Sequence, residues 1–273
     1  MGLNGPGALW HDNFCERIAD AGYYVIRYDN RDVGLSTHFT EFPAPNVLRM
    51  ALPRSMAYGE CVPYTLEDMA ADGMNLLTAL GINEAHVVGC SMGGMIVQIM
   101  ATHYPKRVRS LTIIFSHTGS SKRVKESWAA RLWFLDKPAS SSLEDMVEFK
   151  CRIARRLCGP NYVFEEKECK DLARSLLQRA PEDPMGMRRQ LAAIQRAKCR
   201  AEALKTVKVP TLVIHGMMDQ LIPYENGVQI ASLIGRPAKL VLYPLMSHSL
   251  PDELMPSMTQ EIIWNAQRPT TDA

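Results

Sequence analysis

The residues with the clearest chemical signature are Gly89–Gly93, where the order Gly-Cys-Ser-Met-Gly places one serine between two glycines. Ala85–Val88 before them is a short apolar run typical of a buried strand, and the stretch from Gly94 to His103 carries apolar residues at helical spacing. A serine at such a sharp strand-to-helix turn needs small neighbours, and its hydroxyl projects above the sheet. The pattern predicts a catalytic nucleophile at Ser91, with a structural helix-capping serine as the alternative.

A serine hydroxyl is a weak nucleophile until a base takes its proton, and that base must be held by an acid. In enzymes with this kind of turn, the acid and then the histidine follow the serine along the chain. Asp219 comes just after the apolar run Thr211–His215, and His248 follows the strand-like run Leu240–Tyr243. An open parallel sheet collects its reactive groups beyond the carboxyl ends of its strands. We therefore predict a catalytic triad of Ser91, Asp219 and His248.

The acid and the base both have competitors in the sequence. Asp219 could serve only as a helix cap, a position that favours aspartate. Asp252 is a rival acid, but it lies at a helix start, where a carboxylate interacts favourably with the helix dipole. His117 precedes Asp219 and so breaks the expected order, and His215 belongs to the end of a strand. Asp219 and His248 remain the preferred pair.

Ester cleavage through a serine also needs two donors for the oxyanion of the tetrahedral intermediate. The backbone N–H of Met92 follows the nucleophile at a helix N-terminus and is expected to be the first donor. The second should come from a loop near the nucleophile. Met1–Gly5 has the glycine content of such a loop, and the N–H of Leu3 is our candidate. The alternative for this segment is an ordinary flexible terminus.

Two other polar or reactive features near these residues are assigned to structure rather than catalysis. The side chain of Cys90 should point away from Ser91 into the core. Asp29–Gly34 form a polar loop after a strand-like run, and we expect them to tie loops together through charge-assisted hydrogen bonds.

Strand-like apolar runs alternate with helical stretches, which is typical of an α/β fold with a mainly parallel sheet. The predicted strands are Tyr23–Tyr28, Ala85–Cys90, Arg109–Phe115, Pro210–His215 and Ala238–Tyr243. The predicted helices lie near Asp12–Asp20, Leu66–Leu80, Gly94–His103, Glu225–Ile234 and Glu253–Ala266. The stretch from about Gly119 to Lys205 is helix-rich and breaks this rhythm. It predicts a helical cap at residues 119–205, inserted between core parts at residues 1–118 and 206–273.

Composition excludes several classes of function. The 273 residues suffice for one large domain or a core with an inserted subdomain. A net charge of +2, without a basic run interleaved with aromatics, argues against a nucleic-acid partner. Seven cysteines without metal-ligand spacing suggest reduced thiols of a cytoplasmic protein. No run approaches the ~18 apolar residues of a membrane span, and we find no signal peptide. No metal or organic cofactor is implied.

With these residues in place, the chain resembles the α/β-hydrolase superfamily over nearly its whole length. Within that superfamily it looks most like the aclacinomycin methylesterase group. The segments that carry this resemblance are Met1–Asn4, Val25–Ser36, Val87–Gly93, Arg189–Ile194 and Pro210–Gly216. The resemblance implies Ser91 as nucleophile, Asp219 as acid and His248 as base, with Leu3 and Met92 as oxyanion donors.

The chain departs from the superfamily pattern at its N-terminus. In this fold the oxyanion loop follows the third strand, whereas here the loop motif begins at Met1. The first three strands are therefore expected to be missing, the third of them from between Tyr23–Tyr28 and Ala85–Cys90. Each backbone group left unpaired inside the sheet would cost ~1–3 kcal/mol. We expect an N-terminally truncated form, unless a partner chain or a rearranged N-terminus fills the gap.

The sequence as a whole predicts a cofactor-free serine hydrolase acting on a small-molecule carboxylic ester, such as a methyl ester of a bulky apolar compound. Lactone or C–C bond hydrolysis with the same triad is an alternative, and so is a non-catalytic ligand-binding protein that keeps the fold. Covalent labelling of Ser91 by an organophosphonate would separate an enzyme from a binding protein. The sequence does not specify the substrate or the oligomeric state.

Overall fold

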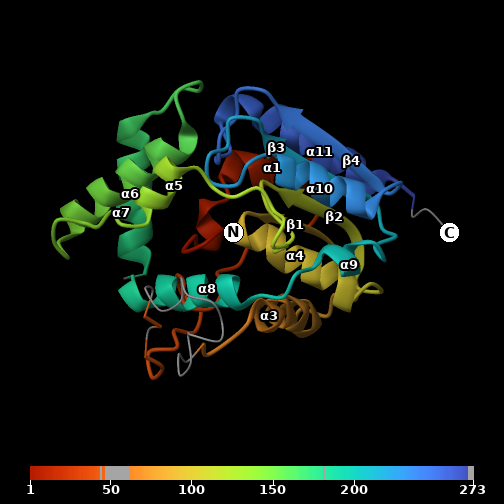
Figure 1. Cartoon of the computed structure of the whole chain (residues 1–273), viewed down its shortest axis with the longest axis horizontal. Coiled ribbons are helices and arrows are strands. Elements are labelled where there is room, and N and C mark those ends of the chain that lie inside the picture. The colour runs from red at the N-terminus through yellow and green to blue at the C-terminus, as the bar shows by residue number, and fades with distance from the viewer. Residues whose placement is uncertain (44, 47–61, 181, 270–273) are drawn as a thin grey trace.

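The computed structural model describes residues 1–43, 45–46, 62–180 and 182–269, with a four-stranded parallel sheet at its centre (Figure 1). The strands are β1 (Ala85–Cys90), β2 (Val108–Ile114), β3 (Thr211–Gly216) and β4 (Ala238–Tyr243), and they lie side by side in that order. All three pairings are parallel. The inner strands β2 and β3 are almost entirely buried, as expected for apolar strands covered on both faces.

The helices that surround the sheet begin and end as follows. Before β1 come η1 (Gly7–Leu9), α1 (Asp12–Asp20) and α3 (Leu66–Ala79), and α4 (Met92–His103) joins β1 to β2. Between β2 and β3 lie α5 (Trp128–Trp133), α6 (Leu143–Cys158), α7 (Glu166–Arg179), α8 (Pro184–Arg196) and α9 (Ala201–Leu204). The chain continues with α10 (Glu225–Ile234), which joins β3 to β4, and then η2 (Asp252–Leu254) and α11 (Met255–Gln267).

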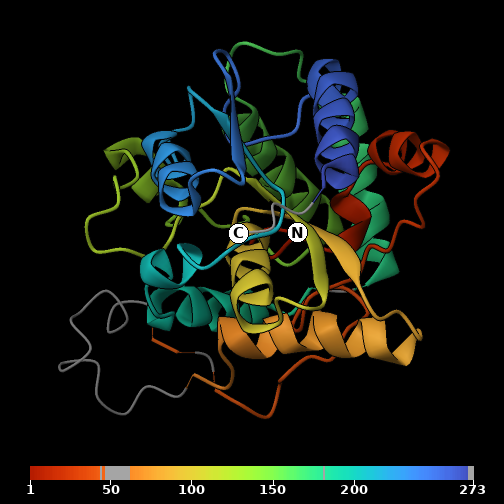
Figure 2. The same ribbon diagram turned by 90° about the vertical axis from the view of Figure 1, so that its right-hand side faces the viewer.

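The helices cover both faces of the sheet. Figure 2 shows α10 on one side of the strands and α11 with α1 on the other. Helix α4 packs on β1 and β2 on the same side as α10, and α3 packs on α4. Two apolar clusters result, one containing Ile96 and Leu111 and the other Ile114 and Met258. The sheet is thus a rigid platform whose strand ends position the loops that follow them.

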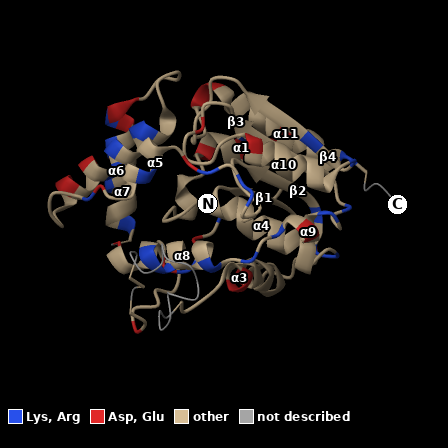
Figure 3. Ribbon diagram, viewed as in Figure 1, with Lys and Arg blue, Asp and Glu red and all other residues tan. Residues whose placement is uncertain are grey.

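The helices between β2 and β3 form a separate group. In Figure 1, α5, α6 and α7 stand to one side of the sheet, and α8 runs back beneath it near α3. Acidic and basic residues are mixed on α6 and α7 (Figure 3). Ion pairs join the two helices, with Lys170 2.6 Å from Glu148 and Arg174 2.7 Å from Glu144. Within the described residues, no helix is long and apolar enough to cross a membrane.

Four of the five predicted strands are confirmed within one residue at each end, but the prediction at Tyr23–Tyr28 is wrong. That segment forms no strand, because no neighbouring strand in the described chain pairs with it. A strand is defined by its hydrogen-bonded partner, so apolar β-branched residues alone do not make one. The five predicted helices are all present, although α4 begins at Met92 and α11 ends at Gln267.

Candidate active site

Ser91 occupies a strained turn between β1 and α4. Its backbone has φ 55° and ψ −118°, a left-handed region that a residue with a side chain rarely adopts. Its N–H donates to the carbonyl oxygen of Ile114 at 3.0 Å, which fixes the turn to the end of β2. A Cβ atom at Gly89 would collide with the carbonyl of Gly93, and one at Gly93 would lie 2.7 Å from the carbonyl oxygen of Met1. The backbone approaches both glycines so closely that a side chain at either position would force it to shift.

A second serine, Ser116, lies just after β2 and holds the same turn. The carbonyl oxygen of Ser91 accepts two hydrogen bonds. One comes from the hydroxyl of Ser116 at 2.8 Å, and the other comes from the N–H of Met95 at 3.2 Å. The side chain of Ser116 also packs so closely on α4 that a Cβ atom at Gly94 would lie 2.6 Å from its Cβ. Sequence reasoning missed this residue. Its position directly after the strand next to β1 is the signal that could have found it.

The structure brings Ser91, His248 and Asp219 together, although 157 residues separate the serine from the histidine. His248 Nε2 lies 3.1 Å from Ser91 Oγ, and His248 Nδ1 lies 2.6 Å from Asp219 Oδ2. A carboxylate only accepts hydrogen bonds, so Nδ1 carries the proton and donates it. Nε2 then has a free lone pair and accepts from the serine hydroxyl. The three groups form one continuous hydrogen-bonded chain.

The carboxylate of Asp219 is fully buried but well supplied with donors. Its Oδ1 accepts from the backbone N–H of Leu221 at 2.9 Å and of Ile222 at 2.8 Å. Burial by itself would raise the pKa of Asp219, but the charge of His248, its hydrogen bond and the nearby ring of His215 outweigh it and hold this pKa well below its usual range. Asp219 is therefore ionised at neutral pH and can stabilise a protonated His248.

Phe115 lies against the histidine and was not predicted from the sequence. Its ring centroid is 4.4 Å from that of His248, and its backbone has φ 36°. The N–H of Phe115 donates to the carbonyl oxygen of Ile214 at 2.8 Å, which ties the residue to β3. The aromatic ring thereby limits the positions that the imidazole of His248 can take.

The loop at the N-terminus lies beside the turn at Ser91. A Cβ atom at Gly2 would be 3.2 Å from Ser91 Cβ, so the loop passes directly next to the nucleophile. Asn4, with φ 56°, donates its N–H to Gln190 Oε1 of α8 at 2.8 Å. Within the described chain, the backbone N–H groups of Leu3 and Met92 donate to no protein acceptor. No protein group of the described chain therefore occupies either amide.

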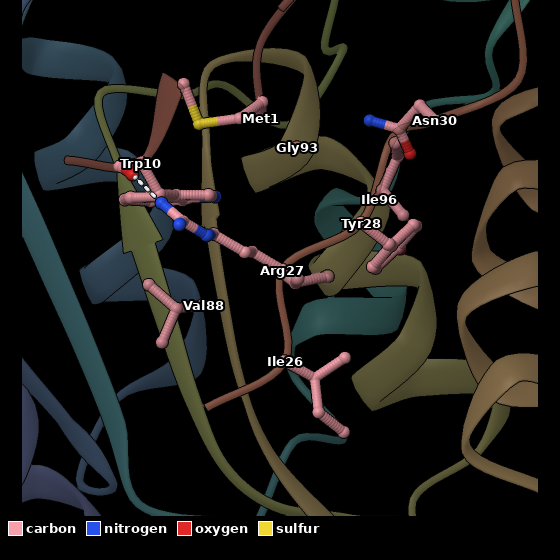
Figure 4. Close-up of a pocket in the computed structure, with 10 residues that line it drawn as sticks. Met1, Trp10, Ile26, Arg27, Tyr28, Asn30, Val88, Gly93 and Ile96 are labelled. Carbon is pink, nitrogen blue, oxygen red and sulfur yellow. Dashed lines mark hydrogen bonds between the residues drawn. The ribbon is translucent and has the colours of Figure 1, made fainter. Parts of the chain in front are cut away.

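A cavity of about 60 Å³ lies behind this loop (Figure 4). Ile26 and Tyr28 line one side of it, and Val88 of β1 and Ile96 of α4 line another. Arg27 reaches across to the carbonyl oxygen of Trp10 at 2.6 Å. None of the three residues of the hydrogen-bonded chain lines this cavity.

The polar loop Asp29–Gly34 ties segments together as predicted, and its partners include α8. Arg189 donates to both carboxylate oxygens of Asp32, at 2.8 and 2.9 Å, and the hydroxyl of Tyr64 donates to the same group at 2.5 Å. Asp32, His38 and Asp183 also place three potential metal-ligand atoms close together. The guanidinium of Arg189 binds both of these carboxylates, so a cation already balances their charge.

Known proteins share the sequence pattern and the fold of this chain. The sequence pattern of a family described as alpha/beta hydrolase fold matches residues 2–253. The chain belongs to the α/β-hydrolase fold family. This α/β hydrolase is 27% identical to the rhodomycin D methylesterase DauP of Streptomyces sp. (strain C5), covering 92% of this chain and 83% of the relative. The expected resemblance to the methylesterase group is thereby confirmed.

Two further comparisons place this α/β hydrolase among related proteins. It is 26% identical to 3-oxoadipate enol-lactonase 2 of Acinetobacter baylyi, over 75% of this chain and 65% of that protein. The crystal structure of a hydrolase from Pseudomonas aeruginosa PA01 superimposes with a TM-score of 0.71 at 21% identity, covering 98% of this chain and 88% of that one. The structural likeness at this identity concerns the fold alone.

Proposed function

We propose that this α/β hydrolase is a serine hydrolase that cleaves carboxylic esters, with Ser91 as nucleophile, His248 as base and Asp219 as acid. The observation that carries the proposal is the unbroken hydrogen-bonded chain, 3.1 Å from serine to histidine and 2.6 Å from histidine to aspartate. The strained backbone at Ser91 supports it, because strain of this kind persists where the surrounding structure holds a residue for a task.

In the proposed reaction, Ser91 Oγ attacks the ester carbonyl carbon while its proton passes to His248 Nε2. The negative oxygen of the tetrahedral intermediate accepts from the amides of Met92 and Leu3. When the C–O bond breaks, His248 returns that proton to the leaving alcohol. Water then attacks the acyl-enzyme, gives a proton to His248 and releases the acid, and Ser91 recovers its hydrogen. Asp219 stays ionised throughout and stabilises the imidazolium.

We further propose that residues 119–205 act as a cap over the core parts 1–118 and 206–273 and shape the substrate site. A methyl ester of a bulky apolar compound is the preferred substrate, supported by the 27% identity to a rhodomycin D methylesterase. Lactone hydrolysis is the second candidate, supported by the 26% identity to an enol-lactonase. C–C bond hydrolysis and ligand binding without catalysis are weaker alternatives. All three enzymatic reactions use the same triad.

Labelling with a fluorophosphonate tests the proposal, because only an activated serine reacts readily with it. The wild type should label at Ser91, the Ser91→Ala variant should not, and circular dichroism should show both to be folded. Turnover of methyl esters, aryl esters and enol lactones by the wild type then ranks the substrate classes. A folded wild type that neither labels nor turns over any of them would contradict the proposal and favour a binding role.

A further inference from the structure

His215 is a fully buried histidine on β3 that the triad does not include. Its Nε2 lies 2.7 Å from the carbonyl oxygen of Ile222 and 3.6 Å from Asp219 Oδ2. A carbonyl oxygen only accepts, so Nε2 carries the ring proton and donates it to Ile222. Nε2 thus also lies near Oδ2, the carboxylate oxygen of Asp219 that binds His248.

The other side of the His215 ring is closed by α10. Nδ1 is buried and has no hydrogen-bond partner in the described chain. A Cβ atom at position 227 would lie 2.5 Å from Nδ1, so only the glycine present there leaves room for the ring. A proton on Nδ1 would be buried without an acceptor, which is costly. These contacts fix the orientation of the ring, with Nε2 toward Ile222 and Nδ1 against Gly227.

Ile222 connects the two side chains through its backbone. Its N–H donates to Asp219 Oδ1 at 2.8 Å, and its carbonyl accepts from His215. The residue that orients the carboxylate is thus itself held by the histidine. Among the described residues, Asp219 is the charged group that lies against His215, with His248 beyond it, and Gly227 of α10 packs against the ring.

We propose that His215 is a positioning residue that holds the Asp219–Ile222 turn, so that Asp219 keeps Oδ2 directed at His248. This inference rests on the proposed function, because it assigns a task within the same site. If the His215 N–H were lost, the turn would relax and the carboxylate would stabilise the His248 imidazolium less well. The histidine would then become a poorer base without any change in substrate binding.

A matched pair of variants tests this role. In His215→Gln the amide nitrogen lies at about the distance of Nε2 and can still donate to Ile222, whereas in His215→Asn it is too short to reach. We expect the Gln variant to retain most of kcat. The Asn variant should lose about 10- to 100-fold in kcat at unchanged KM, the range expected for a misplaced catalytic group. The acid limb of its kcat/KM profile should shift to lower pH.

A second readout does not depend on activity. The Nδ1 proton of His248, in its 2.6 Å bond to Asp219, should give a far-downfield proton NMR signal in the wild type and the Gln variant. In the Asn variant this signal should move upfield or disappear by exchange. A folded His215→Asn variant with the kcat, acid limb and NMR signal of the wild type would overturn the inference. A folded His215→Gln variant with the same losses as His215→Asn would also overturn it.

Two further comparisons keep the test decisive. If the Asn variant does not fold, a folded Gly227→Ala variant displaces the same ring, because its methyl group would lie 2.5 Å from Nδ1, and must lower kcat and shift the acid limb in the same direction. Unchanged kinetics there would also overturn the role. If the wild type itself hydrolyses no ester or lactone, the proposed function fails, and the NMR comparison still decides whether His215 positions Asp219.

Discussion

Arg189 and Asp32 are joined by two hydrogen bonds of 2.8 and 2.9 Å, although 157 residues separate them in the chain. Both side chains are buried. The next residue of α8, Gln190, accepts from the N–H of Asn4 and donates to the carbonyl oxygen of Arg31, each at 2.8 Å. Helix α8 thus holds the polar loop and the N-terminal loop at the same time. It is the structural link between the helices after β2 and the surroundings of Ser91.

Loss of the buried ion pair should destabilise the protein strongly. Arg189→Met would leave the Asp32 carboxylate buried without its cation, at a cost of about 3–5 kcal/mol. Urea denaturation followed by circular dichroism measures the change. Arg188→Met is the matched control, because Arg188 forms no ion pair with a described residue. The double variant Arg189→Met, Asp32→Asn should recover part of the lost stability, because it no longer buries an unpaired charge. Equal destabilisation by Arg189→Met and Arg188→Met would contradict this account.

The free energy of unfolding should fall on acidification, because the buried carboxylate of Asp32 then becomes protonated. Burial alone would raise the pKa of Asp32, but hydrogen bonds from Arg189 and Tyr64 outweigh it and lower this pKa. In the unfolded chain the pKa of an aspartate is about 3.9. Because the folded-state pKa of Asp32 is lower, the ionised carboxylate contributes its full stabilisation above about pH 3.9. This stabilisation is lost as the pH falls toward the folded-state pKa. Urea midpoints measured from pH 7 to pH 3 should drop below about pH 4. Asp32→Asn should flatten this dependence, and an unaltered slope would argue against it.

Gln190 should affect turnover more than substrate binding. Gln190→Leu removes the hydrogen bond that anchors Asn4, one residue after the proposed oxyanion donor at Leu3. We expect kcat for an aryl ester to fall about tenfold at similar KM, less than the about 100- to 1000-fold cost of losing such a donor outright. Gln229→Leu is the control, because Gln229 lies on α10 and accepts a hydrogen bond from the hydroxyl of Thr118 rather than from the N-terminal loop. Equal losses of kcat in both variants would exclude a specific role for Gln190.

Gly93→Ala should disturb the N-terminal loop directly. The added methyl group would lie 2.7 Å from the carbonyl oxygen of Met1, and a backbone group cannot move aside as a flexible side chain can. We expect slower fluorophosphonate labelling of Ser91 in a protein that stays folded. Gly73→Ala is the comparison, since its methyl group would meet the side-chain ends of Met100 and Tyr28. Labelling of Gly93→Ala at the wild-type rate would show that the loop does not set the reactivity of Ser91.

Local pattern was enough to predict much of this molecule. Four strands and the order Ser91, Asp219, His248 follow from apolar periodicity and turn residues, which act over only a few neighbouring positions. The prediction failed at Tyr23–Tyr28, where the residues favour a strand but no strand among the described residues pairs with them. Pairing is a property of two segments, and the sequence of one segment does not contain it.

The sequence by itself determined which residues stand at the ends of strands, and hence which side chains could meet above the sheet. It also determined that the polar loop Asp29–Gly34 would hold other segments through charge-assisted hydrogen bonds. Only the tertiary structure decided the partners, such as Arg189 for Asp32 and His215 for the Asp219 turn. The reason is physical. A buried charge or N–H must find its counterpart wherever the fold brings one within about 3 Å, and sequence separation does not limit that choice.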